Sequence, residues 1–147
     1  MSVTVTQLFN EAYRIDSLHP KSRSGEHEEL AWYSMRDYHK AHVIVDVGSI
    51  AANGTVDVHM HQATDDAGSG SKAISGKALT QLGDTDDNNL YVINMDTSEM
   101  DVTNNFDYIA VELDCGGNAA CLTNVILLRG QTRFAAVDDS NLGEVIE

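Results

Sequence analysis

Short runs in which apolar and polar residues alternate constrain the fold of this chain more than any other feature. In TVDVHMHQ, residues 55–62, the apolar residues Val56, Val58 and Met60 take every second position. Successive side chains of a β-strand point to opposite faces, so this run predicts a strand with one face in the core. The run before it, residues 42–50, is rich in β-branched residues and predicts a buried strand, with Ile44 facing away from its valines.

Turn-forming residues separate these runs. Asn53 and Gly54 lie between the first two strands and predict a hairpin that joins them. Residues 72–82 are compatible with a short strand or a single helical turn. Further strands are expected at residues 90–95, 106–114, 122–128 and, as a short last strand, 130–137.

These signals together predict an all-β fold. No segment has a 3.6-residue apolar period over three turns, and roughly six to eight short strands between turns are typical of an antiparallel β-sandwich of the jelly-roll type. An immunoglobulin-like sandwich fits the turn spacing equally well, but the cysteine–tryptophan–cysteine framework is absent. We expect an extended N-terminal arm and loop over residues 1–31, the β-sandwich domain over 32–137 and an acidic tail over 138–147.

The charge balance bears on the possible partners. The 147 residues carry a formal charge of −14, and the few Lys and Arg residues are scattered. Nucleic acids and anionic membrane surfaces attract clustered cations, so we expect neither as a partner. No apolar run reaches the roughly 18 residues of a membrane span, and the first residues lack a basic start and a continuous apolar stretch. We therefore expect synthesis in a cytoplasm without export.

The two cysteines, Cys115 and Cys121, are separated by GGNAA. A second pair of ligands at zinc spacing is missing, so a zinc site is not predicted from them. The linker is typical of a hairpin turn, and we expect two buried or half-buried thiols. A disulfide remains open, because it requires the two residues to lie directly opposite each other, and a cytosolic origin disfavours it.

Asp57, His59 and His61 are the best candidate metal ligands, because alternate residues of a strand share one face and imidazole and carboxylate groups suit zinc or a similar ion. A solvated or interface face of a very acidic protein shows the same pattern, so no metal or other cofactor is predicted. His39 and His42 do not converge on a metal by themselves.

No motif predicts catalysis, and we expect a protein that is not an enzyme. A nucleophile elbow is absent, and Gly68, Gly70 and Lys72 do not have the spacing of a phosphate-binding loop. Asp84, Asp86 and Asp87 lack the glycine and glutamate of a calcium loop. Paired acids for glycoside hydrolysis usually come with aromatic sugar platforms, and only 6% of the residues are aromatic.

Two motifs resemble small virion structural proteins of tailed bacteriophages. The first is SM-x-x-YH-x-A, residues 34–41, which leads into a strand; the second is QAT-x-x-AG-x-G-x-K-x-I, residues 62–74. The strand FDYIAVELD and its partner NVILLRG follow in the same order, so the resemblance covers about residues 32–134. It carries no catalytic residues.

The resemblance implies a capsid decoration, or cement, protein on the outer surface of a phage head. Its partners would be the major capsid protein and further copies of the chain, with a trimer preferred. The N-terminal arm would add a strand to a neighbouring subunit. A polyanionic genome repels a chain of charge −14, which suits the outside of the head.

Two other functions stay open. One is a head–tail connector or tail protein. The other is a carbohydrate- or receptor-binding module on the virion, which predicts an exposed aromatic platform formed by Trp32, Tyr33 or Tyr38. Core or interface packing explains the same aromatic residues, because they border a strand.

Overall fold

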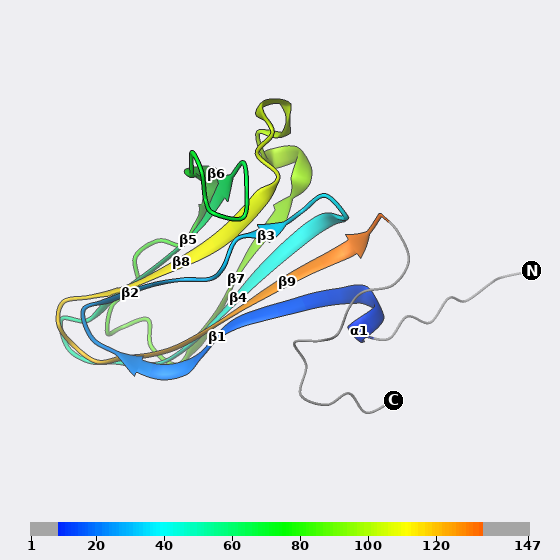
Figure 1. The fold of residues 1–147 in the computed structure, drawn as a ribbon. Coiled ribbons are helices and arrows are strands. Elements are labelled where there is room, and N and C mark those ends of the chain that lie inside the picture. The colour runs from blue at the N-terminus through cyan, green and yellow to red at the C-terminus, as the bar shows by residue number, and fades with distance from the viewer. Residues whose placement is uncertain (1–8, 134–147) are drawn as a thin grey trace, which may run out of the picture.

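The computed structural model describes residues 9–133, which form two antiparallel β-sheets packed face to face (Figure 1). Sheet 1 has the order β1 (Tyr13–Arg23), β9 (Cys121–Thr132), β4 (Tyr38–Ile50), β7 (Asn89–Asp96). Sheet 2 has the order β2 (Glu26–Glu29), β8 (Tyr108–Gly116), β5 (Thr55–Ala63), β6 (Lys72–Ala78), and β3 (Tyr33–Ser34) also pairs with β8. The helical elements are α1 (Phe9–Ala12) and the 3₁₀ turns η1 (Thr97–Glu99) and η2 (Val102–Asn104).

The strand order is that of a jelly roll. Apart from the two-residue β3, each sheet contains four strands, and the chain passes repeatedly from one sheet to the other. The predicted all-β sandwich of jelly-roll type is confirmed.

The core lies between the inner faces of the sheets. Sheet 1 contributes Val43, Val45 and Leu127, and sheet 2 contributes Val58 and Met60, all of them at most 1% exposed. The alternation predicted for residues 55–62 is confirmed, since every second residue of β5 enters the core. The sequence allowed either a short strand or a helical turn over residues 72–82, and the structure has the short strand β6 there.

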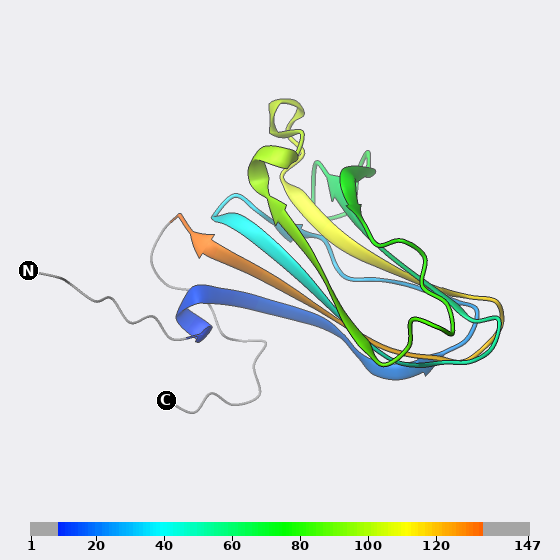
Figure 2. The same cartoon turned by 180° about the vertical axis from the view of Figure 1, so that it is seen from behind.

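The sandwich is wedge-shaped, as Figures 1 and 2 show from opposite sides. The sheets meet at the end where β1 connects to β2, β4 to β5 and β8 to β9, and they splay apart towards β3, η1 and η2. At the closed end a side chain on Gly117 would collide with the neighbouring connection, because its Cβ would lie 1.8 Å from the carbonyl oxygen of Asn53. Gly117 also has a φ of +74°, which favours glycine.

A buried arginine joins the two sheets at the closed end. Arg23 is 1% exposed. Its Nε donates to Oε2 of Glu28 in sheet 2 at 2.8 Å, and its Nη1 donates to the carbonyl oxygen of Thr123 in sheet 1 at 2.7 Å. The carbonyl oxygens of His19 and Lys21 accept further bonds, so the buried charge is well compensated.

Two predicted hairpins are wrong. Asn53-Gly54 joins β4 of sheet 1 to β5 of sheet 2, and the linker between Cys115 and Cys121 joins β8 of sheet 2 to β9 of sheet 1. Both connections therefore cross the sandwich instead of pairing adjacent strands. A turn motif identifies where the chain reverses, but the choice of sheet depends on packing of the whole chain.

The predicted arm needs a correction as well. Residues 13–23 form β1, which pairs with β9 of the same chain, and residues 26–29 form β2, which pairs with β8. β1 lies at a sheet edge and contains Pro20 inside a register shift between Leu18 and Lys21, where a missing N–H is tolerated. Such polar edge strands lack the alternation used for the prediction.

Residues 1–8 and 134–147 lie outside the described residues. The start of the expected arm, the end of the expected strand 130–137 and the expected acidic tail, residues 138–147, belong to these segments. Among residues 9–133, no helix has the length and apolar character needed to cross a membrane.

Candidate functional site

The outer face of sheet 2 carries a group of titratable side chains that lie close together. We call it the histidine–carboxylate cluster and define it as His27, His59, His61, Glu112 and Asp114. The side chains come from three neighbouring strands, β2, β8 and β5. The register places His59 opposite Glu112, and His27 opposite Asp114. Strand alternation turns all five side chains away from the core.

Glu112 lies between the two histidines of β5. Nδ1 of His61 is 2.7 Å from Oε1 of Glu112, and Nε2 of His59 is 3.6 Å from Oε2 of the same carboxylate. His59 Nε2 is also 3.4 Å from Oδ2 of Asp114. The imidazole rings of His59 and His61 meet edge to face, with centroids 5.2 Å apart.

The β2 side of the cluster perturbs two pKa values. Nδ1 of His27 donates to Oδ1 of Asp114 at 2.6 Å, and this bond raises the pKa of His27. Burial, and after it the like charge of Glu112, raises the pKa of Glu29. Proton uptake is therefore favoured at His27 by its hydrogen bond and at Glu29 mainly by burial.

The predicted group of Asp57, His59 and His61 is only partly brought together. His59 and His61 converge as expected, but the carboxylate of Asp57 accepts a hydrogen bond from Nε2 of Gln81 at 2.8 Å. Glu112 takes its place, with ligand atoms of His59, His61 and Glu112 all within 4.8 Å of one another. Glu112 is one of the polar positions of the run 106–114, so the sequence indicated that its side chain faces away from the core. The register that places it beside β5 could not be derived from the sequence.

The outer face of sheet 1 carries apolar side chains among polar ones such as His42, Asp46 and Asn94. We call the group Ile44, Leu90, Val92, Leu122 and Ile126 the apolar face. Ile44 of β4 pairs with Val92 of β7 on one side and with Ile126 of β9 on the other, so three apolar side chains lie abreast. Val92 is 50% exposed, Leu90 63% and Leu122 43%. Contiguous exposed apolar groups mark interaction sites in soluble proteins.

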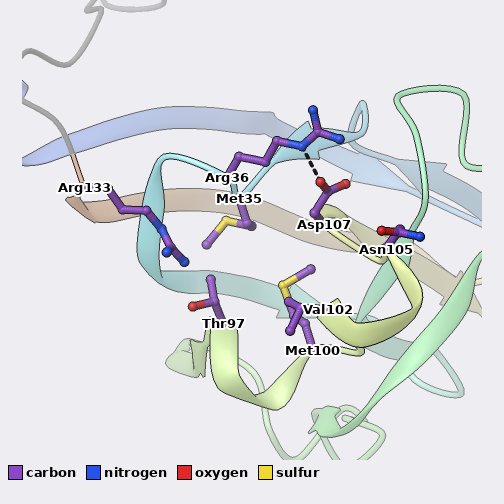
Figure 3. A pocket seen from close by; sticks show the side chains of 8 residues that line it. All are labelled: Met35, Arg36, Thr97, Met100, Val102, Asn105, Asp107 and Arg133. Atoms are coloured by element: carbon purple, nitrogen blue, oxygen red, sulfur yellow. Dashed lines mark hydrogen bonds and ion pairs between the residues drawn. The ribbon is translucent and has the colours of Figure 1, made fainter.

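A pocket of about 260 Å³ opens at the splayed end of the sandwich (Figure 3). The buried thioethers of Met35 and Met100 line it together with Val102, and the guanidinium groups of Arg36 and Arg133 lie at its rim. Arg36 is held by an ion pair with Asp107. Thr97, Asn105 and Asp107 also line the pocket, so its lining is mixed and selects no class of ligand.

The three aromatic residues expected as a platform pack against the protein. The buried guanidinium of Arg129 lies over the rings of Tyr33, at 4.8 Å, and Tyr38, at 5.0 Å. Arg129 also pairs with Asp16 at 3.3 Å. The indole of Trp32 covers Gly68, where an added Cβ would lie 2.5 Å from its Nε1. The packing interpretation therefore describes these residues better than the platform.

Asp86 and Lys72, from the calcium-loop and phosphate-loop candidates, make contacts within the protein. Oδ2 of Asp86 accepts a bond from the backbone of Gly83, and Lys72 pairs with Asp101. Both cysteines are buried free thiols, and burial raises the pKa of Cys115 to about 11. A thiol with so high a pKa is a poor nucleophile at neutral pH.

Comparisons with known proteins were made at the level of sequence and of structure. No family model matches the chain, and no curated protein matches its sequence. A subunit of Bacillus endospore appendages, described as disulfide-linked pili, aligns with 92% of this chain and 100% of its own at 9% identity and a TM-score of 0.48. The SPBc2 prophage-derived protein YomS aligns over 86% and 99% at 12% identity and a TM-score of 0.42.

A third similar structure comes from infectious bursal disease virus, Gx strain. It aligns with 84% of this chain and 33% of its own at 10% identity and a TM-score of 0.40. These neighbours are pilus, prophage and virus proteins. At such identities and scores, none of them assigns a function or a partner to the chain.

Proposed function

We propose that this chain is a structural protein of a bacteriophage virion, and that it decorates the outer surface of the head as a cement protein. The apolar face of sheet 1 is the observation that carries the proposal. It would dock on the major capsid protein across the seams between shell subunits. Because the chain binds the assembled shell and not its separated parts, binding stabilises the shell by mass action without any chemistry.

The apolar face has the properties of a protein-docking surface. Ile44, Val92 and Ile126 form a continuous row across three strands. Burying one such side chain contributes about 1.5–3 kcal/mol, although part of this is offset by the cost of association. Many weakly bound copies, closed into trimers around symmetry axes, would multiply these contacts.

The charge supports a position outside the head. The formal charge of −14 repels packaged DNA, which is itself a polyanion. The row of Ile126, Ile44 and Val92 contains no acidic residue, although Asp46 lies in the next row of the same face, opposite Leu90. An acidic molecule with one apolar face is soluble alone and still able to dock.

The fold is compatible with this function and does not select it. Double-sheet jelly rolls occur in viral capsid, lectin and cupin domains, and a fold by itself does not imply a function. The motifs of residues 34–41 and 62–74, which resemble tailed-phage virion proteins, favour the virion among these. Residues 13–23 pair with β9 of their own chain, so they do not add a strand to a neighbouring subunit.

A sedimentation experiment tests the proposal. Purified protein is mixed with isolated heads that lack it, the heads are pelleted, and the bound copies are counted. Decoration predicts on the order of hundreds of copies per head and greater resistance of the heads to heat. About a dozen copies or fewer would instead indicate a connector or tail protein, and no binding would contradict a role on the head.

Two matched variants locate the docking surface. Val92→Asp places a charge in the apolar face and should weaken head binding by roughly tenfold to hundredfold. Val102→Asp introduces the same change at a valine of similar exposure, 54% against 50%, which lies in η2 and outside the apolar face. It should bind like the wild type. Equal binding by both variants would show that the apolar face is not the docking surface.

A further inference from the structure

We propose that the outer face of sheet 2 is a binding site for a divalent transition-metal ion of the zinc type. The ligands are Nε2 of His59, Nδ1 of His61 and the carboxylate of Glu112. This site is separate from the apolar face, and the proposal does not depend on the virion function.

The types of ligand select the class of metal. Two imidazole nitrogens and one carboxylate suit zinc and its neighbours, whereas calcium and magnesium prefer ligand sets made of oxygen atoms. In three-ligand protein sites of this kind, the fourth position of a tetrahedral ion is taken by water. Water can reach the cluster from the outside of the sheet, since the side chains of His59 and His61 are 28% and 20% exposed.

The ligand atoms of the three residues lie within 4.8 Å of one another, which is close enough for one ion after small side-chain shifts. Bonds of about 2.0–2.1 Å at tetrahedral angles place neighbouring ligand atoms about 3.3–3.4 Å apart. His59 Nε2 lies 3.6 Å from Glu112 Oε2, near this value. His61 Nδ1 lies 2.7 Å from the other oxygen, Oε1. A rotation of the Glu112 carboxylate would have to bring one oxygen to about 3.3–3.4 Å from both nitrogens.

A second observation points to a missing ligand. Nε2 of His59 is buried from solvent and has no hydrogen-bond partner. The carboxylate oxygens of Glu112 and Asp114 lie near it, at 3.6 Å and 3.4 Å, outside the usual range of an N–H···O bond. Buried polar atoms are normally satisfied, and a coordinated ion would satisfy this nitrogen.

The backbone holds the ligands ready for the ion. His59 and His61 are two residues apart on β5, and Glu112 is the direct cross-strand partner of His59 on β8. Asp114 is held by His27 and adds negative charge beside the ion. Since β5 and β8 are the two central strands of their sheet, an ion bound by both would connect these strands to each other.

Zinc titration of the full chain tests the site. Protein stripped with a chelator is titrated with Zn²⁺ by calorimetry, and its Tm is measured with and without the ion. We expect one ion per chain and, at a hundredfold excess over Kd, a rise in Tm of roughly 5–10 °C. Co²⁺ in place of Zn²⁺ should give the intense visible bands of a four-coordinate ion.

Variants separate the site from general binding to a very acidic surface. His61→Ala and Glu112→Gln should each weaken Zn²⁺ binding on the order of a hundredfold, whereas His39→Ala removes an exposed histidine of β4 and should change nothing. His59→Ala serves if one of these variants does not fold. Zinc affinity that is unchanged in the cluster variants, or matched by Mg²⁺, would overturn the proposal.

Discussion

The two outer faces of the sandwich differ in chemistry, although the inner faces are built from the same kinds of residue. Sheet 1 presents the apolar face with Val92 half exposed, and sheet 2 presents the histidine–carboxylate cluster. In both sheets the inward positions of neighbouring strands hold valine, leucine and methionine. Stability requires only the inner faces to be apolar, so the outer faces are free to acquire different functions.

The difference also separates two kinds of interaction. An apolar face gains free energy by leaving water, so it suits a large protein surface and depends little on pH. A cluster of histidines and carboxylates gains by binding cations or protons, so it depends on pH and on metal. The head-binding and zinc experiments above address the two faces separately, and three further predictions concern how each face contributes to the folded molecule.

The largest expected effect tests whether both faces belong to one folding unit. Arg23→Ala removes the buried guanidinium that joins β1 of sheet 1 to Glu28 of sheet 2, and should lower the free energy of unfolding by about 3–5 kcal/mol. Urea unfolding followed by circular dichroism measures it. Arg36→Ala is the control, because Arg36 is 66% exposed and its solvent-screened ion pair with Asp107 should contribute far less than Arg23 does. Equal losses would show that Arg23 does not join the sheets energetically.

The next prediction separates the two faces of a single strand. Leu127→Ala deletes a side chain that is fully buried on the inner face of β9 and should cost about 2–5 kcal/mol. Ile126→Ala changes the adjacent residue on the apolar face and should cost less than about 1.5 kcal/mol in the isolated protein, because its neighbours are already partly solvated. Equal costs in urea unfolding would indicate that the apolar face is covered and belongs to the core.

The smallest effect concerns the pH dependence of the other face. The bond to Asp114 raises the pKa of His27 above its ordinary value of 6.5 in the folded state. The resulting stabilisation is fully present below about pH 6.5 and is lost as the pH rises through the folded-state pKa. Because His27 is exposed, we expect about 0.5 kcal/mol or less between pH 6 and pH 8.

Urea unfolding at the two pH values measures this dependence, and His27→Gln should remove that increment. The variant Ile126→Ala, on the apolar face, should keep it. If the wild type were instead more stable at pH 8 than at pH 6 by this increment, and His27→Gln showed the same pH dependence, the His27–Asp114 bond would make no contribution to the pH dependence of stability.

The sequence predicted the core strands because alternation leaves a direct signal. Val56, Val58 and Met60 enter the core as expected, and Ile44 lies on the face opposite the valines of β4. β1 and β2 were missed for a physical reason. Both are edge strands, and edge strands tolerate proline and charged residues that would weaken a central strand.

In the candidate sites, too, only the features with a local sequence signal were predicted. His59 and His61 were predicted to share a face, because two residues of one strand at spacing two always do. Glu112 and the row of Ile126, Ile44 and Val92 depend on cross-strand register, which links segments far apart in the chain. Register follows from the packing of all strands together, and no local pattern encodes it.

The sequence by itself determined an acidic, all-β chain with apolar and polar faces on its central strands, because charge and period are local properties. Only the tertiary structure decided that the turns at Asn53-Gly54 and Gly116–Gly117 cross between sheets. It also decided which outer side chains become neighbours, and therefore where a partner or an ion can bind. Those choices depend on burying both inner faces at once, which is a property of the whole chain.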